Sequence, residues 1–150
     1  MAADAWGDAP CVFCEILAGH LPGWVVAESE LAVALLDLRH VSPGHTLILP
    51  RRHIQSIYEV DDALAGDLMR LTVRVARGVR SAFAPDGLNI WQSSGRAAGQ
   101  EAPHVHMHVF PRVRGDRLLD IYPGGPPPNM THEALRPVAE RLREALSRED

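Results

Sequence analysis

The hydrophobic and polar positions of the chain change their period several times, and each period predicts a different element. Between residues 61 and 83 apolar residues recur at three- and four-residue steps, which is typical of an amphipathic helix, and Asp61 or Asp62 can cap its start. The same spacing predicts a short helix within residues 11–19 and a C-terminal helix over 131–148. Pro137 places the start of that last helix shortly before itself.

Four further stretches are expected to be strands, at residues 24–28, 31–38, 45–49 and 88–92. Pro43 and Gly44 are turn residues between the second and third stretch, so this pair of strands is expected to be antiparallel. Residues 93–102 form a loop with two glycines. Its backbone N–H groups could bind an anion, or the loop could be a plain connector.

The most informative pattern is His-Val-His-Met-His-Val-Phe at residues 104–110. Alternation predicts a strand with three imidazoles on one face and the apolar side chains toward the core, and Pro111 limits its continuation. Three imidazoles in register are costly as packing residues. They indicate either a metal site or a catalytic cluster in which one imidazole is nucleophile or base and another is the acid.

Composition and charge narrow the classes of function. The chain has 150 residues, 46% hydrophobic and 23% charged, which is ordinary for a single globular domain with its own core. The net charge of -4 gives no broad electrostatic case for binding nucleic acid or an anionic membrane. No signal peptide or spanning segment is recognisable, so we expect a cytoplasmic protein. Its expected parts are a flexible N-terminus (1–10), a main domain (11–122) and a Pro/Gly-rich linker with a C-terminal helix (123–150).

The two cysteines, Cys11 and Cys14, are spaced Cys-x-x-Cys. This spacing suits a metal knuckle or a redox pair, and a structural disulfide is not expected in a reducing compartment. No thioredoxin-like βαβ pattern surrounds the pair, which disfavours the redox interpretation.

Residues 104–110 resemble the signature of the histidine triad (HIT) family, in which three histidines alternate with apolar residues. Further motifs follow the family order: Cys11-x-Phe13-Cys14-x-Ile16-Leu17-Ala18-Gly19, Asp37, Pro43-Gly44-His45, Pro50-x-x-His53 and Gly99-Gln100. The resemblance spans about residues 11–112, and the ending Phe110-Pro111-Arg112 is similar to bacterial and fragile-histidine-triad-type members. It implies an α+β fold with an antiparallel sheet, one long helix packed on it, and a homodimer.

The resemblance also implies a nucleotidyl hydrolase or transferase. Such an enzyme cleaves a nucleoside monophosphate, here with AMP favoured, from a phosphoanhydride or a phosphoramidate. His106 matches the nucleophile that forms a nucleotidyl-imidazole intermediate, and His108 matches the residue near the α-phosphate and leaving group. Gln100 matches a side chain that contacts the scissile region, and His45 matches a histidine that supports the triad.

The substrate pocket implied by the resemblance has a polar and an apolar part. Asp37 matches the acidic residue that holds the ribose hydroxyls, and its carboxylate suits a vicinal diol. The apolar walls around the base match Phe13, Ile16, Leu35 and Leu38, and Ser93 and Gly99 are also expected at the substrate. Ser93 stands where Hint-type members carry asparagine, and Glu101 stands where many members carry a small hydroxyl residue. The leaving group is therefore left open.

A structural zinc ion is the cofactor that the resemblance implies. The matching ligands form a Cys2His2 set, which favours zinc, and they are Cys11, Cys14, His53 and His104. Two other interpretations stay open at this point. One is a hydrolase with a catalytic metal on His104, His106 and His108, and the other is a nucleotide-binding scaffold with little catalysis.

Overall fold

The computed structural model describes residues 6, 10–39, 42–117, 124–125 and 127–148. The chain divides into two compact units, residues 1–116 and residues 117–150. The expected flexible N-terminus lies largely outside the described residues. The expected boundary between residues 122 and 123 lies wholly outside them, so the division at that point stays a prediction.

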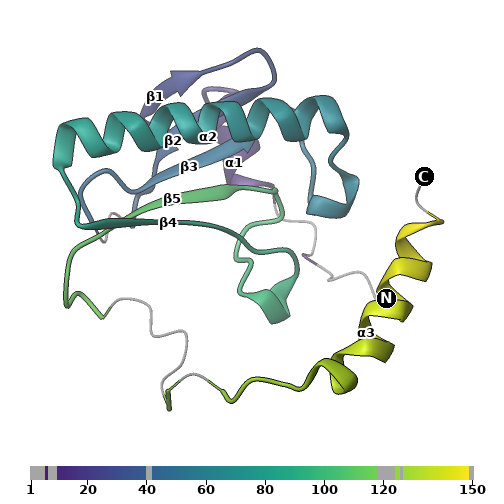
Figure 1. Cartoon of the computed structure of the whole chain (residues 1–150). Helices are drawn as coiled ribbons and strands as arrows, with labels where there is room; N and C mark the ends of the chain where they lie inside the picture. Colours follow the sequence, from purple (N-terminus) through teal and green to yellow (C-terminus); the bar gives the residue numbers. More distant parts are fainter. Residues whose placement is uncertain (1–5, 7–9, 40–41, 118–123, 126, 149–150) are drawn as a thin grey trace. The chain divides into compact units, whose positions relative to one another are not determined.

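The first unit is built on a five-stranded antiparallel sheet with strand order β1-β2-β3-β5-β4 (Figure 1). The strands are β1 (Val25–Glu28), β2 (Ala32–Leu36), β3 (Thr46–Pro50), β4 (Gly87–Gln92) and β5 (Met107–Arg112). This confirms the α+β fold with an antiparallel sheet, and all four other predicted strands are present. Because β5 lies between β3 and β4, the strand that contains His108 is an interior strand of the sheet.

Helices cover both faces of this sheet. The long helix α2 (Asp62–Phe83) packs on one face and the short helix α1 (Val12–Leu17) on the other (Figure 1). Alternate residues of β2 and β3 point to opposite faces, which is why both faces are apolar. The set on the α1 side is Val33, Leu35, Leu47 and Leu49, with Phe13, Ile16 and Leu17 packed against it. The Asp61 carboxylate caps α2 by accepting from the Leu64 N–H at 2.9 Å, as predicted.

Two shorter helical turns lie in the connections. One is η1 (Ile57–Glu59), which precedes α2, and the other is η2 (Arg96–Ala98), which lies in the loop between β4 and β5. The loop expected over residues 93–102 therefore contains one turn of 3-10 helix, with Gly99 at φ +84° closing it.

The described residues of the second unit include the helix α3 (His132–Leu146). It begins five residues before Pro137, so that proline lies in the second turn rather than at the helix start. The Thr131 hydroxyl accepts from the Ala134 N–H at 3.2 Å and caps the helix. Within the described part of the chain, none of the helices has the length and apolar character that crossing a membrane requires.

The predicted histidine strand is partly wrong at both ends. The strand β5 begins at Met107, so His104 and His106 precede it, and it continues through Pro111 to Arg112. Pro50 explains the late start. It lies where the β3 ladder would continue beyond the Ile48–Met107 pair, and proline has no N–H to donate. The Val105 N–H instead donates to the Ile54 carbonyl at 2.7 Å.

Candidate active site and metal cluster

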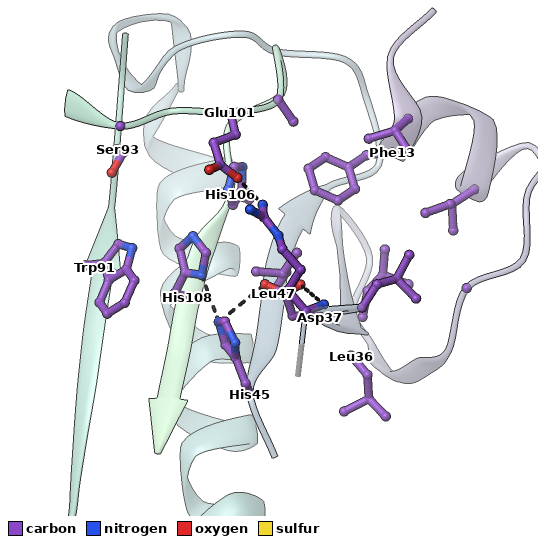
Figure 2. A pocket seen from close by; sticks show the side chains of 18 residues that line it. Phe13, Leu36, Asp37, His45, Leu47, Trp91, Ser93, Glu101, His106 and His108 are labelled. Carbon is purple, nitrogen blue, oxygen red and sulfur yellow. Dashed lines mark hydrogen bonds and ion pairs between the residues drawn. The ribbon is translucent and has the colours of Figure 1, made fainter. Parts of the chain in front are cut away.

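A pocket of about 580 Å³ opens on the α1 side of the sheet (Figure 2). It lies where α1, the end of β2, β3, β4, β5 and the loop before β5 converge. The residues that line it are Val12, Phe13, Ile16, Gly23, Leu35, Leu36, Asp37, Leu38, Arg39, His45, Leu47, Trp91, Ser93, Gly99, Glu101, Ala102, His106 and His108. Its volume suits a small organic ligand.

His106 is held with one ring nitrogen tied to the main chain. Its Nδ1 lies 2.7 Å from the carbonyl oxygen of His104, two residues earlier. A carbonyl oxygen only accepts, so Nδ1 carries the proton and Nε2 keeps its lone pair. Burial lowers the pKa of His106 from its usual value, because desolvation disfavours the charged ring. A neutral imidazole with a free Nε2 can act as a nucleophile.

His108 lies beside His106, with ring centroids 5.0 Å apart. Its Nδ1 is 2.9 Å from Nε2 of His45, which in turn is 3.5 Å from an Asp37 carboxylate oxygen (Figure 2). The carboxylate favours a proton on His45 Nε2, which then donates to His108 Nδ1 and leaves the proton of His108 on Nε2. Burial first, and then the charges of His106 and His45, lower the pKa of His108 to about 4.

Trp91 packs against His108 and forms one wall of the pocket. Their ring centroids are 4.8 Å apart, and the two residues are direct partners in the β4–β5 ladder. Ser93 follows on the same strand end, beyond the last pair of that ladder. This wall therefore comes from β4, opposite the apolar residues of α1 (Figure 2).

The apolar end of the pocket contains all four predicted hydrophobic residues. They are Phe13, Ile16, Leu35 and Leu38. Leu35 is buried, whereas Leu38 is 76% exposed and lies at the rim. The centroids of the Phe13 and His106 rings are 5.3 Å apart, so α1 lies next to His106 as well as forming part of the apolar end.

The side chain of Gln100 is bonded within the loop before β5. Its side chain is buried, does not line the pocket and is bonded to main chain on both sides. Its Oε1 accepts from the Gly95 N–H at 2.7 Å, and its Nε2 donates to the carbonyls of Gln55 and Ala102 at 2.8 Å each. In this structure Gln100 holds the loop before β5 and is not among the residues that line the pocket, and its contact with the scissile region stays a prediction.

The glycine loop offers fewer anion-binding amides than the sequence indicates. The N–H groups of Ala98, Gly99 and Gln100 donate to carbonyls of the same loop, and that of Gly95 donates to Gln100. At these four positions the loop is thus better described as a plain connector than as an anion-binding loop. Gly99 and Ser93 nevertheless line the pocket, as expected.

A second cluster lies next to the pocket and contains all four predicted metal ligands, Cys11, Cys14, His53 and His104, whose donor atoms are within 4.8 Å of one another. The sulfur of Cys11 is 3.4 Å from Nδ1 of His104, and that of Cys14 is 3.3 Å from Nδ1 of His53 and 3.6 Å from Nδ1 of His104. A tetrahedral zinc ion with these ligands has sulfur–nitrogen edges of about 3.6 Å, which follows from its usual bond lengths. The distances therefore fit zinc.

Two further features fit a cation in this cluster. Nε2 of His104 lies 2.9 Å from the Pro50 carbonyl oxygen, and this bond directs Nδ1 toward the cysteines, as outer-shell bonds do at metal-ligating histidines. Burial, together with the neighbouring Cys11, raises the pKa of the Cys14 thiol to about 11. A cation bound in this cluster would stabilise the thiolate form of Cys14, which is the form that binds metal.

The same contacts disfavour a catalytic metal on the three triad histidines. Both ring nitrogens of His104 are used, by the cysteines and by Pro50. Among the described residues, the donor atoms of His104, His106 and His108 do not lie close enough together to form a set that could hold a metal ion. Apart from the Cys/His cluster, the set that could do so is Asp37, His45 and His108.

Arg39, Trp91, Leu36 and Leu47 are among the pocket residues that the sequence interpretation missed, with Val12, Gly23 and Ala102. Arg39 forms an ion pair with Glu101, and the two residues are 62 positions apart in sequence. Trp91 could have been found from the strand pattern, because pairing of β4 with the histidine strand places an aromatic residue beside an imidazole. Arg39 has no such signal, since its partner depends on how the loop before β5 folds.

Comparison with known proteins gives matches in sequence and in structure. A model of the HIT domain matches residues 18–115. The Bacillus subtilis protein hit is 43% identical over 107 residues, which cover 71% of this chain and 74% of that protein. Adenosine 5′-monophosphoramidase hnt1 of Schizosaccharomyces pombe is 31% identical over 132 residues, which cover 88% of this chain and 95% of that protein.

Two solved structures show the same similarity. A crystal structure of a HIT family member from Bacillus subtilis has a TM-score of 0.82 at 34% identity, covering 91% of this chain and 96% of that one. A crystal structure of a Zn-bound histidine triad family protein from Mycobacterium smegmatis has a TM-score of 0.68 at 32% identity, covering 93% of this chain and 99% of that one.

Proposed function

Since the chain belongs to the HIT family, we propose that it is a nucleotide hydrolase that releases a nucleoside monophosphate through a covalent intermediate on His106. The observation that carries the proposal is the 2.7 Å contact from His106 Nδ1 to the His104 carbonyl, since it leaves Nε2 unprotonated in the pocket. Similarity to the adenosine 5′-monophosphoramidase of Schizosaccharomyces pombe supports AMP linked to an amine as a substrate class.

In the proposed first step, Nε2 of His106 attacks the α-phosphorus and forms a P–N bond. The bond from phosphorus to the leaving group breaks. The Nε2–H of His108 donates a hydrogen bond to the leaving group, which departs with a proton taken from solvent. In the second step water attacks the phosphorus, the P–N bond breaks with its electron pair returning to Nε2 of His106, and the proton of the water is released to solvent. The two neutral rings suit these roles because their Nδ1 partners, the His104 carbonyl and His45, place the two Nε2 atoms in opposite protonation states.

Substrate binding follows from the two ends of the pocket. The base is proposed to lie in the apolar part formed by Phe13, Ile16, Leu35 and Leu38, and the ribose hydroxyls to bind Asp37. One oxygen of this carboxylate accepts from the Arg39 N–H at 2.9 Å, which fixes the group at the end of β2. The leaving group then points toward the wall of Trp91 and Ser93. Gln100 acts in this proposal by holding the loop.

Cys11, Cys14, His53 and His104 are proposed to hold a structural zinc ion. A zinc ion there would supply a fixed point that joins Cys11 and Cys14, at the start of α1, to His104 in the segment before β5. The Zn-bound relative from Mycobacterium smegmatis supports the choice of metal. Four protein ligands would leave no open position on the ion, so its role would be to fix the structure and not to activate water.

A homodimer is also proposed, on the resemblance to the family. β4 is one edge of the sheet and pairs with β5 along one side. An edge strand can be extended by a second copy. Light scattering after size-exclusion chromatography measures the mass directly, and a mass of one chain, 16.4 kDa, would exclude the dimer under those conditions.

The test of the proposed function is a panel of adenylated compounds with rapid quenching. Adenosine 5′-phosphoramidate and diadenosine triphosphate cover the two bond types. We expect a burst of leaving group equal to the enzyme concentration, followed by a slower steady state, if hydrolysis of the intermediate limits turnover. A scaffold without catalysis would bind AMP and release no leaving group from any compound.

A further inference from the structure

An ion pair between Arg39 and Glu101 joins two rims of the pocket. Arg39 follows the end of β2, and its main-chain N–H donates to Asp37. Glu101 follows Gln100, which is anchored by three side-chain hydrogen bonds. Each partner therefore extends from a fixed segment. Figure 2 shows Glu101 next to His106, on the side away from Leu36.

The charge balance of the pocket depends on this pair. The charged residues that line it are Asp37, Arg39 and Glu101, which leaves a net charge of -1. The hydrogen bond from Arg39 is the largest cause that lowers the pKa of Glu101, so this carboxyl is ionised at neutral pH. The guanidinium of the pocket is thus already neutralised by the protein itself.

The position of Glu101 relates it to the leaving group. With the base at α1, the ribose at Asp37 and the phosphorus at His106, the leaving group lies toward Trp91, Ser93 and Glu101. Further phosphates there would place additional negative charges beside a carboxylate whose arginine is already paired. A neutral or amine leaving group avoids that repulsion, and an ammonium group would be attracted.

We propose that Glu101, held in place by Arg39, is a specificity-determining residue that favours neutral or amine leaving groups over leaving groups that carry further phosphates. This inference rests on the proposed function, because it assumes that the α-phosphorus lies at His106. Like charges at a binding site act mainly by rejecting the wrong ligand. Glu101 should therefore lower kcat/KM mainly for the polyphosphate substrate.

The experiment compares kcat/KM for adenosine 5′-phosphoramidate and diadenosine triphosphate in the wild type, Glu101→Gln and Arg39→Gln. We expect the wild type to favour the phosphoramidate at least about tenfold, as a difference of one repelled charge can produce. Glu101→Gln frees Arg39 and should narrow that ratio by about fivefold or more, whereas Arg39→Gln should widen it. High salt should reduce the discrimination, because both side chains are solvent-exposed.

The matched control is Glu28→Gln, which breaks an exposed pair with Arg51 outside the pocket and should leave the ratio unchanged. Thermal unfolding checks that each variant is folded. Equal ratios in the wild type and Glu101→Gln would overturn the inference while leaving the hydrolase proposal intact. No turnover of either substrate by the wild type, with no nucleotidyl-enzyme formed, would instead mean that the proposed function fails.

Discussion

The carbonyl oxygen of His104 lies 2.7 Å from Nδ1 of His106, while the ring of the same His104 faces Cys11 and Cys14. One residue therefore belongs to both clusters: its side chain to the proposed metal site and its main chain to the proposed nucleophile. Whatever fixes the His104 ring also fixes the carbonyl that sets the protonation state of His106. A metal ion held by this cluster would therefore also steady the His104 carbonyl beside the pocket.

Replacing His106 by Asn should abolish turnover of adenylated compounds. The change removes Nε2, the atom proposed to form the P–N bond, so we expect kcat to fall by at least about a thousandfold. Rapid-quench mass spectrometry should detect a nucleotidyl adduct on His106 in the wild type and none in the variant. Binding of AMP, measured by calorimetry, should persist because Asp37 and the apolar residues remain.

The control for this variant is its unfolding temperature, which should stay close to that of the wild type. A nucleotide trapped on a residue other than His106, or full activity of His106→Asn, would contradict the covalent mechanism.

Purified protein should contain one zinc ion per chain, and its removal should lower the unfolding temperature. The reason is that binding free energy at a structural site contributes to folding. Cys14→Ser should lose the metal and melt at a lower temperature. Elemental analysis and thermal melting measure both effects without reference to activity.

The matched control is His20→Asn. His20 is an exposed histidine beside Glu15 and lies outside the four-ligand cluster. It should keep the metal and the melting temperature. Metal-free protein that melts like the wild type would count against a structural role for zinc.

Much of the fold could be predicted because its signals are local. The three-and-four spacing in α2, the apolar runs in β2 and β3 and the alternation in β5 each indicate which side chains are buried. The pocket residues, in contrast, were predicted through the resemblance to the HIT family. The pairing of His104 with Cys11 and Cys14 is non-local, over about ninety residues, and came from family resemblance alone. The roles of Gln100 and Arg39 could not be predicted, because both depend on the path of the loop before β5.

The start of β5 shows the same limit in another form. Alternation alone predicted a strand from His104, but a ladder also needs a partner with a free N–H. Pro50 cannot supply one, so the chain keeps an extended shape and bonds elsewhere. The period of a sequence predicts which way side chains point, whereas pairing depends on the neighbouring strand.

Asp37→Asn should weaken selection for a ribose with both hydroxyls. The carboxylate can accept from two hydroxyl groups, whereas an amide has one accepting oxygen. We expect the ratio of kcat/KM for ribo- and 2′-deoxyribo-substrates to fall by about tenfold, the value of one hydrogen bond to a charged group. An equal loss of kcat/KM for the ribo- and the 2′-deoxyribo-substrate would mean that Asp37 acts through His45 and not on the sugar.

Stability should fall as the pH is lowered from about 7 to about 5, and His108 should contribute to that fall. Its pKa is lowered to about 4 in the folded protein, whereas a free imidazole titrates near 6.5. Between these values the unfolded chain binds more protons, so the free energy of unfolding decreases with decreasing pH. Urea unfolding measures the free energy of unfolding at the two pH values, and the difference between them should be smaller for His108→Asn than for the wild type. His20→Asn, which changes an exposed ring, should behave like the wild type; an unchanged difference in His108→Asn would refute the assignment.

Gly44→Ala should destabilise the first unit, and Gly78→Ala should not. Gly44 has φ of +89°, and a Cβ atom built there would lie 2.7 Å from the Phe83 ring. Alanine is strained at that φ, and the ring must also move, so we expect a loss of about 1–3 kcal/mol. Gly78 lies on the exposed side of α2 with no atom within 4 Å of such a Cβ, and alanine there should add about 0.5–1 kcal/mol through helix propensity. Urea unfolding measures both changes. Gly44 immediately precedes His45. If Gly44→Ala lowers the free energy of unfolding but preserves turnover, the turn serves stability and not the placement of His45.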